Sequence, residues 1–411
     1  MPLTLRWADE SSLDRVAETR LRCYASAAKE LDAYREMLRV DLRVKAGDFL
    51  LAEEGDEAVG TASAFSFTTW VRGAPLPCQG VGWVGTIRTR RRAGTGGNSH
   101  GIASQLMHEM LHRARDRGQV LSALMPFRAS FYEHFGYGVV ERRCEWIVPL
   151  SILPQGPFDG LRFSNPLDRP AIADCHQRSV ERGQCDMERS PARWSQLAAT
   201  MADGFEVIDR PTLDGPVHGM LHYTQLNKDG KDLLRVQARC ADDLPAFQRQ
   251  LHFLASLKDQ YHVVSLSLPA DMPFNWLLKE RQLPHRLVNH PAAEMKPITR
   301  MQVRVLDHAK LIEAMHLSPE YCGEVVVAVH ETDGSQSKFR ITLSSGRAAV
   351  QPSDATPDVE CSDTIWAAIV LGDISTAQAQ SCGLVSLHSP RAASLLHAFA
   401  NGPVPFCEEY F

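Results

Sequence analysis

The residues best suited to carry out chemistry lie between residues 83 and 118. An apolar stretch at residues 83–87 precedes a run of arginines and a glycine-rich segment, and apolar residues then recur with helical spacing from Ile102. Glycines let backbone N–H groups close on a phosphate, arginines supply fixed charge, and a helix N-terminus adds the positive end of its dipole. This order predicts a site for a phosphate-bearing cofactor, formed by Arg90, Arg91 and Arg92, by the loop glycines Gly94, Gly96, Gly97 and Gly101, and by the start of the helix at Ile102. A flexible loop with solvated arginines is the alternative for the same residues.

A second motif lies inside the predicted helix. His108, Glu109 and His112 match the pattern His-Glu-x-x-His, in which two imidazoles one turn apart bind zinc and the glutamate acts as general base. Residues 113–117 contain no third histidine, and their arginines place positive charge beside the ion. We therefore favour a solvated helix face, expect no metal, and keep a zinc hydrolase as an alternative.

Composition restricts the class of protein. A chain of 411 residues predicts two or three domains, and its hydrophobic content of 44% and charged content of 23% are ordinary for a soluble protein. It has no apolar run as long as a membrane span and no apolar start, so we expect a cytoplasmic protein without membrane partners. The ten cysteines include no Cys-x-x-Cys pair and are expected to be buried thiols. A net charge of −5 argues against nucleic-acid binding and mildly favours cationic small molecules.

The segments around the loop alternate between helical and strand patterns. Helical spacing is found at residues 12–29, with a cap at Ser11 or Ser12, and a second short helix follows at residues 30–37. Strands at residues 49–53 and 58–67 are joined by a turn at Gly55, and a helix that starts near Gly101 is expected to stop at Gly118. A strand at residues 120–125, a short helix within 131–138 and a strand at 141–149 complete this α/β unit.

The unit is then repeated. Residues 5–15 are echoed by residues 161–169, and the helix and strand that end at Pro126 are echoed by residues 251–269, so we expect two copies of one unit. Where the first copy has its basic loop, the second has residues 239–243 with two aspartates, whose charge is wrong for a phosphate. The second copy is therefore expected to have lost the cofactor. From about residue 296 an α+β third domain is expected, with strands at 301–305, 324–330, 338–343 and 347–351 and helices at 307–315, 363–371 and 390–399.

Residues 83–118, followed by Phe131-Tyr132-Glu133-His134-Phe135-Gly136-Tyr137-Gly138, resemble the acetyl-CoA site of the GNAT N-acetyltransferases. The three-part chain is more closely similar to the Eis-like (enhanced intracellular survival) branch. The resemblance implies an α/β (α+β) fold with two tandem GNAT-like acyl-CoA N-acyltransferase domains, the second degenerate, and a sterol-carrier-protein-like C-terminal domain. The implied boundaries are 1–150 for the acetyl-CoA-binding domain, 151–296 for the degenerate copy, and 297–411 for the domain that delivers the C-terminal carboxylate.

The resemblance also implies roles for single residues. Backbone groups at Trp83, Val84 and Thr86 would hold the pantetheine arm and polarise the thioester carbonyl. Tyr132 matches the tyrosine that protonates the departing CoA thiolate, and the C-terminal carboxylate of Phe411 matches the base that accepts the amine proton, directly or through water.

The sequence departs from the family at two places. Residues 93–99 look like an insertion, so the phosphate loop aligns either at Gly94 and Gly96 or at Gly101 and Ala103; we favour Gly101, because its distance from Gly118 fits the usual helix. Members that acetylate aminoglycosides carry acidic pocket residues where this chain has Ser26 and Tyr410, which removes charge partners for a polycation, although Glu408 and Glu409 could partly compensate. Expected acceptor contacts are Tyr24, Ser26, Tyr34, Phe127 and Tyr410.

These observations predict direct acetyl transfer from acetyl-CoA to a primary amine. The acceptor stays open among an aminoglycoside, a polyamine and a lysine side chain. The alternative from another class is a non-catalytic protein that binds acetyl-CoA or a lipid. The resemblance further implies a homo-oligomer, a hexamer in this family.

Overall fold

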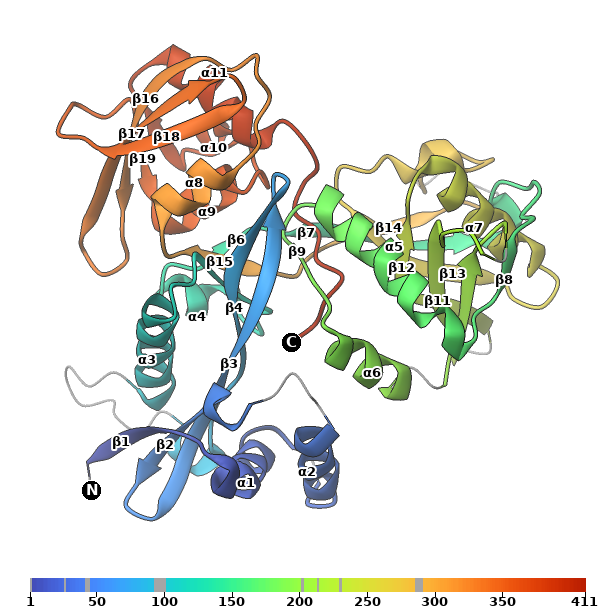
Figure 1. Ribbon diagram of the computed structural model, residues 1–411, viewed down its shortest axis with the longest axis horizontal. Coiled ribbons are helices and arrows are strands. Elements are labelled where there is room, and N and C mark those ends of the chain that lie inside the picture. The colour runs from blue at the N-terminus through green and yellow to red at the C-terminus, as the bar shows by residue number, and fades with distance from the viewer. Residues whose placement is uncertain are drawn as a thin grey trace.

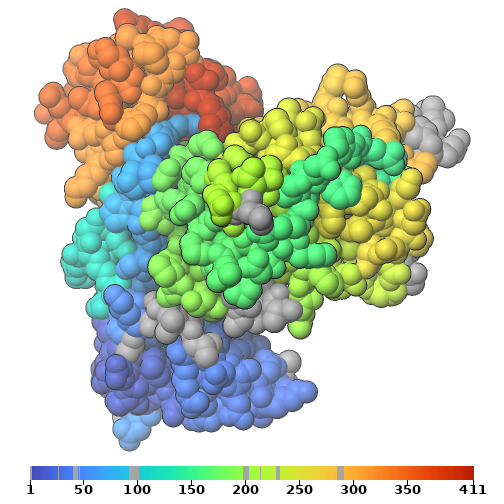
Figure 2. All heavy atoms as spheres, turned by 45° about the vertical axis from the view of Figure 1, so that its right-hand side comes forward, coloured from blue at the N-terminus to red at the C-terminus, as the bar shows by residue number. Residues whose placement is uncertain are grey.

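The computed structural model describes residues 2–25, 27–40, 45–91, 101–200, 203–212, 214–228, 231–284 and 291–411. The chain forms three units, and its C-terminus lies between them (Figure 1). Figure 2 shows the second unit, in green to yellow, beside the first unit in blue, with the third unit in orange and red above. None of the helices in these ranges is both long enough and apolar enough to cross a membrane.

The first unit is built on a twisted sheet in the order β1-β2-β3-β4-β5-β15-β6. All neighbours in this sheet are antiparallel except β4 and β5, which run parallel, and the short strand β9 extends the sheet beside β3. The strands are β1 Leu3–Trp7, β2 Phe49–Glu54, β3 Glu57–Val71, β4 Ala74–Thr86, β5 Leu121–Leu124, β6 Gly138–Val139, β9 Asp186–Met187 and β15 Gln302–Val305.

Within the described residues of the first unit there are four α-helices, and local sequence explains several of their ends. They are α1 Leu13–Tyr24, α2 Glu30–Val40, α3 Ile102–Asp116 and α4 Ala129–Glu133. Gly118, with φ of +68°, ends the α3 segment as predicted, and Gly55, with φ of +61°, makes the β2–β3 turn. The helix expected at residues 12–29 ends earlier, at Tyr24, and Ser12 occupies the N-cap position without a side-chain capping bond.

The second unit repeats the strand order of the first. Read from one edge, β8-β10-β11-β12-β13-β7-β14 corresponds strand by strand to β1-β2-β3-β4-β5-β15-β6, and β12 with β13 forms the matching parallel pair. This agreement confirms the predicted repeat. The elements are β7 Arg142–Pro149, β8 Leu161–Phe163, α5 Arg169–Arg182, α6 Pro191–Thr200, β10 Phe205–Asp209, β11 Gly219–Lys228, β12 Lys231–Ala241, α7 Leu244–Ser256, β13 Val263–Pro269 and β14 Glu294–Thr299.

The two sheets exchange one strand each. β7 precedes residue 150 in the chain but pairs with β13 and β14 in the second sheet. β15 follows residue 297, and although we expected its segment in the third domain, it pairs with β5 and β6 in the first sheet. Both occupy the same place, between the fifth and last strands of their sheets, so the exchange ties the two units together.

The third unit has a five-stranded sheet in the order β18-β17-β16-β19-β20. The predicted strands and helices are present, and β19, β20 and α10 are additional. One apolar core continues from this unit into the first sheet, where it includes Val71, Val120 and Val303. The elements are α8 His308–Ala314, β16 Gly323–His330, β17 Gln336–Ser344, β18 Arg347–Pro352, β19 Val359–Ser362, α9 Asp363–Val370, α10 Thr376–Ser381, β20 Val385–Leu387 and α11 Pro390–Ala400.

Candidate active site

The central feature of the site is the point where β4 leaves its parallel neighbour. β5 ends at Leu124, which pairs with Val81, whereas β4 continues to Thr86. The register with β3 shifts between the Gly82–Ser63 and Gly85–Thr61 pairs, so β4 carries one extra residue, and Trp83 has φ of +54°. Such a bulge turns the strand away from its neighbour and frees backbone groups that a ligand can use.

Tyr24 lies against the free part of β4. Its hydroxyl donates a hydrogen bond to the carbonyl oxygen of Val84. A methyl group on Gly85 would lie 2.9 Å from the Tyr24 ring, so the glycine allows this close approach. Desolvation raises the pKa of Tyr24, and the neighbouring Tyr132 phenol adds to that rise. Tyr132 belongs to the same apolar core as Val84 and as Cys23, the residue before Tyr24, so both tyrosines border the free part of β4.

Tyr132 belongs to the short helix α4 and is buried. Its ring packs in edge contacts with Phe127 at 5.8 Å, Phe131 at 5.0 Å and Tyr137 at 6.3 Å between ring centroids. Burial raises the pKa of Tyr132 to about 12, which keeps the phenol protonated at neutral pH. Phe127 is 76% exposed and forms the outer side of this aromatic group.

The last residue of the chain reaches the same strand. The carboxyl carbon of Phe411 lies 3.5 Å from the position of a methyl group on Gly82, one residue before Trp83. The Phe411 ring packs on Phe67 with centroids 5.0 Å apart, and a methyl group on Gly80 would lie 3.0 Å from it. The C-terminus is therefore fixed beside the free end of β4.

Hydrogen bonds along the tail explain why this terminus is not frayed. Phe406 N–H donates to the carbonyl oxygen of Gln184 at 2.9 Å, Cys407 N–H to Glu141, and Glu408 N–H to Asp186 at 2.9 Å. The Glu409 side chain is 1% exposed and pairs with two arginines, at 2.9 Å for Arg189 and more closely for Arg193. Contacts of this density hold a terminal segment in one position.

The basic loop is described only in part. Arg92, Gly94, Gly96, Gly97 and the predicted acceptor contact Ser26 lie outside the described residues. Arg91 is exposed and donates to the carbonyl oxygen of Cys23 at 2.8 Å. Gly101 is the N-cap of α3 and provides no side-chain cap, with Ile102 as the first helical residue, which confirms the predicted helix start.

The corresponding helix of the second unit begins differently. Asp243 caps α7, and its carboxylate accepts a hydrogen bond from Ala246 N–H at 2.8 Å. A carboxylate at this position uses the N–H groups and the helix dipole that a phosphate would need. In the first unit the N-cap of α3 is Gly101, which has no side chain to occupy the helix N-terminus, so of these two helices α3 is the one whose start fits an anionic cofactor.

Arg20 is a site residue that sequence reasoning missed. Its guanidinium lies 3.4 Å from the centroid of the Trp83 ring and 4.4 Å from that of Tyr34. A usable signal existed, because Arg20 and Tyr24 are four residues apart and share a helix face. Tyr410 is 65% exposed and lies with its ring 5.8 Å from the Arg300 guanidinium.

Comparison with known proteins identifies the family. Residues 4–140 and 185–305 match two family models, each described as an acetyltransferase (GNAT) domain. The chain is 24% identical over 339 residues to N-acetyltransferase Eis of Mycobacterium tuberculosis, which covers 78% of this chain and 77% of that protein. The chain belongs to the Eis-like GNAT N-acetyltransferases. It is thus an acetyltransferase, and enzymes with this domain use acetyl-CoA.

Other relatives of the Eis-like chain agree. An uncharacterized N-acetyltransferase of Streptomyces avermitilis is 25% identical over 369 residues, which is 84% of this chain and 83% of that one. A GCN5-related N-acetyltransferase from Anabaena variabilis has the same fold, with a TM-score of 0.84, 18% identity and full coverage of both chains. Eis1 from Mycobacterium abscessus has a TM-score of 0.79 at 19% identity, again with full coverage.

The histidine motif in this Eis-like chain makes contacts with protein groups. Glu109 accepts a hydrogen bond from the Trp7 indole at 2.8 Å, His112 faces Asp116 at 3.1 Å, and the His108 ring packs on Phe135. Within the described part of the chain, no three His, Cys, Asp or Glu side chains are arranged to hold a metal ion. These side chains lie on the outer face of α3.

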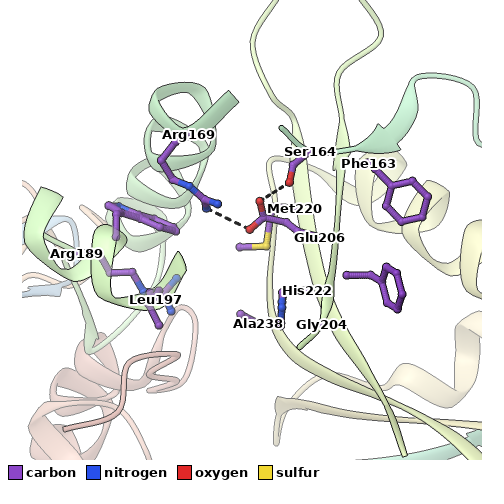
Figure 3. A pocket seen from close by; sticks show the side chains of 12 residues that line it. Phe163, Ser164, Arg169, Arg189, Leu197, Gly204, Glu206, Met220, His222 and Ala238 are labelled. Carbon is purple, nitrogen blue, oxygen red and sulfur yellow. Dashed lines mark hydrogen bonds and ion pairs between the residues drawn. The ribbon is translucent and has the colours of Figure 1, made fainter. Parts of the chain in front are cut away.

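A cavity of roughly 310 Å³ lies in the second unit, between α5, α6 and the sheet. Figure 3 shows Arg169 and Ser164 directed at Glu206, at distances of 3.2 and 2.7 Å. Arg189, on another wall, is the arginine that pairs with Glu409. These charges compensate one another, and the cavity belongs to the copy whose α7 is capped by Asp243. The acetyl-transfer chemistry is therefore better served by the first unit.

Proposed function

We propose that the chain transfers the acetyl group of acetyl-CoA directly to a primary amine at the free end of β4. The observation that carries the proposal is the position of the Phe411 carboxyl carbon, 3.5 Å from a methyl group placed on Gly82. It brings a carboxylate, ionised at neutral pH, to the strand whose backbone is free for a ligand. A buried phenol, Tyr132, lies at the same opening.

Acetyl-CoA would supply the thioester carbonyl and the thiol leaving group. Arg91 and the N-terminus of α3 at Gly101 and Ile102 suit its phosphates, together with Arg92, Gly94 and Gly96. The backbone of Trp83, Val84 and Thr86 suits its pantetheine arm.

The chain's own groups then act in order. The Phe411 carboxylate accepts the proton of the amine, directly or through water. A backbone N–H of β4 donates to the oxygen that gains charge as the amine attacks. Tyr132 donates its proton to the sulfur that departs, and a high pKa ensures that this proton is present.

The larger organisation is part of the proposal. Residues 1–150, 151–296 and 297–411 form an acetyl-CoA-binding unit, a degenerate copy and a sterol-carrier-like unit, with β7 and β15 exchanged between the first two. The third unit delivers the tail. A cytoplasmic location and a hexameric assembly are carried over from the sequence and its family resemblance, and an aminoglycoside, a polyamine and a lysine side chain are candidate acceptors.

The test measures CoA release with a panel of amines. Adding two glycines after Phe411 converts its carboxylate to an amide, and we expect kcat to fall by roughly 10²- to 10⁴-fold, the usual contribution of a general base. Tyr132→Phe, which keeps the ring, should lower kcat without changing the melting temperature. Unchanged turnover in the extended protein would refute the carboxylate role, and activity abolished by a chelator would favour the zinc motif.

A further inference from the structure

We propose that Arg20 binds an anionic group of the acceptor, so that the preferred acceptor is an amine that also carries a carboxylate, such as a free amino acid. This inference rests on the proposed transferase site and names its substrate class. Five observations support it: the stacking of Arg20, the weak contacts of its N–H groups, its contrast with nearby arginines, its surroundings, and the position of Phe411.

Arg20 is held by its faces. The guanidinium carbon lies 3.4 Å from the Trp83 ring centroid and 4.4 Å from that of Tyr34, and the side chain is half-buried. Stacking of this kind attracts the cation through the ring quadrupoles and fixes the plane of the guanidinium. Because the N–H groups point outward in that plane, stacking leaves them available for a carboxylate, which guanidinium binds with two parallel hydrogen bonds.

The edge of Arg20 makes weak contacts. Its Nη1 donates to the Sδ atom of Met37 at 3.7 Å, and a thioether is a poor acceptor. The Tyr34 hydroxyl, which is 3.4 Å from Glu30, also interacts with it. Within the described ranges, Arg20 forms no ion pair with a carboxylate.

Neighbouring arginines on α1 and α2 are paired. Arg15 lies 3.1 Å from Glu53, and Arg22 contacts Glu57 closely. Arg35 reaches three carboxylates, those of Asp14, Glu18 and Asp32, at 3.2 to 3.5 Å. Arg20 thus differs from these arginines, because its guanidinium can form an ion pair with a ligand instead of with a carboxylate of the protein.

The surroundings of Arg20 favour an anion. Desolvation lowers the pKa of Arg20, although a guanidinium stays charged, so its positive charge is exposed to little water, and among the described residues no carboxylate lies within ion-pair distance of it. Aromatic rings of Trp83 and Tyr34 lie against its faces. A polycation would meet like charge here, whereas a carboxylate would be attracted.

The geometry orients a zwitterionic acceptor. Arg20 stacks on Trp83, and a methyl group placed on the preceding residue, Gly82, would lie 3.5 Å from the carboxyl carbon of Phe411. The acceptor's carboxylate can therefore face Arg20 while its amine faces the Phe411 carboxylate. The product is the N-acetyl amino acid, and the amine proton is passed to Phe411.

The experiment compares matched amines that differ only in a carboxylate. Lysine is paired with cadaverine, and 5-aminopentanoate with butylamine, and CoA release is followed at saturating acetyl-CoA. We expect kcat/KM to be at least about tenfold higher for the carboxylated member of each pair, because charge-assisted hydrogen bonds supply a factor of roughly 10 to 100. This comparison uses the unaltered protein and does not depend on the folding of any variant.

Variants test whether Arg20 is the cause of the preference for carboxylated amines. Arg20→Met should abolish the preference by raising KM for lysine and 5-aminopentanoate without raising KM for cadaverine, Arg20→Lys should restore part of the preference, and Arg20→Glu should reverse it. Arg35→Met is the matched control, since its guanidinium is already paired, and it should behave as wild type. Equal turnover of both members of each pair, unaffected by Arg20→Met, would overturn the inference alone. Failure of every amine to accept acetyl would overturn the proposed function and the inference together.

Discussion

The position of the C-terminal carboxylate depends on one buried ion-pair group, and Glu409→Gln tests this dependence. Glu409 is 1% exposed, and the side chains of its partners Arg189 and Arg193 are 4% and 12% exposed. Glutamine keeps the shape of glutamate but removes its charge. The two arginines are then left in a site with little water.

The magnitude follows from the cost of an unpaired buried charge. Removing one partner of a buried ion pair costs about 3–5 kcal/mol. A terminal segment can avoid this cost by detaching while the three units stay folded, and detachment removes the Phe411 carboxylate from β4. Because 1.4 kcal/mol changes an equilibrium constant tenfold, the fraction of molecules whose tail is attached to β4 can fall by roughly 10²- to 10³-fold. We therefore expect kcat to fall by about that factor, with small changes in melting temperature and in KM for acetyl-CoA.

The assay combines CoA release with the rate at which carboxypeptidase removes the tail. Glu408→Gln is the matched control: it makes the same change one residue earlier, at a side chain that forms no ion pair within the described residues. It should leave both measurements as in wild type. If Glu409→Gln keeps kcat within about threefold and its tail resists the peptidase, the ion pairs do not position the carboxylate.

Two further predictions concern stability. The pKa of Asp186 is raised to about 7 by burial and by nearby Glu408, so its contribution to stability is full below the usual value of 3.8 and is lost as pH rises through 7. Asp186→Asn should therefore have a higher melting temperature than wild type at pH 8 and nearly the same one at pH 4. The gain in free energy of unfolding at pH 8 is up to roughly 4 kcal/mol, at 1.36 kcal/mol per unit of pKa shift. Equal melting temperatures at pH 8 would contradict this prediction. Gly138→Ala should lower the melting temperature by several degrees, because the methyl group would lie 1.9 Å from the Thr364 carbonyl oxygen and separate α9 from the first sheet. Gly101→Ala, where a methyl group meets nothing within 4 Å, is its control by the same thermal scan.

Local sequence patterns were sufficient to predict most helices and strands of the first unit. The β2–β3 turn needs a residue with positive φ, and Gly55 supplies it; Gly118, with φ of +68°, ends the α3 segment for the same reason. Such features depend on neighbours in sequence, so spacing and residue type predict them. The repeat was visible for the same reason, because each copy preserves the order of its elements.

The pairing of strands that lie far apart in the chain could not be predicted from the sequence. β7 and β15 have ordinary strand patterns, and nothing in either pattern states which sheet each joins. Helix α1 was predicted to run to residue 29, but it ends at Tyr24, whose hydroxyl is bound to the carbonyl oxygen of Val84 sixty residues away. Arg20 was missed because its stacking on Trp83 joins α1 to β4 across a similarly long separation in sequence.

The three-unit junction explains how the last residue of a long chain can be held beside β4. Arg72, at the β3–β4 turn of the first unit, donates to the carbonyl oxygens of Phe399 and of Pro403, the latter at 3.0 Å. Gln184 of the second unit accepts from Arg72 N–H at 2.9 Å and donates to Leu371 of the third unit at 2.6 Å. The tail starts at this junction, so its direction is set only when all three units are packed together. If the Phe411 carboxylate is the base, as proposed, a form in which one unit is unpacked should release the tail and lack the group that deprotonates the amine.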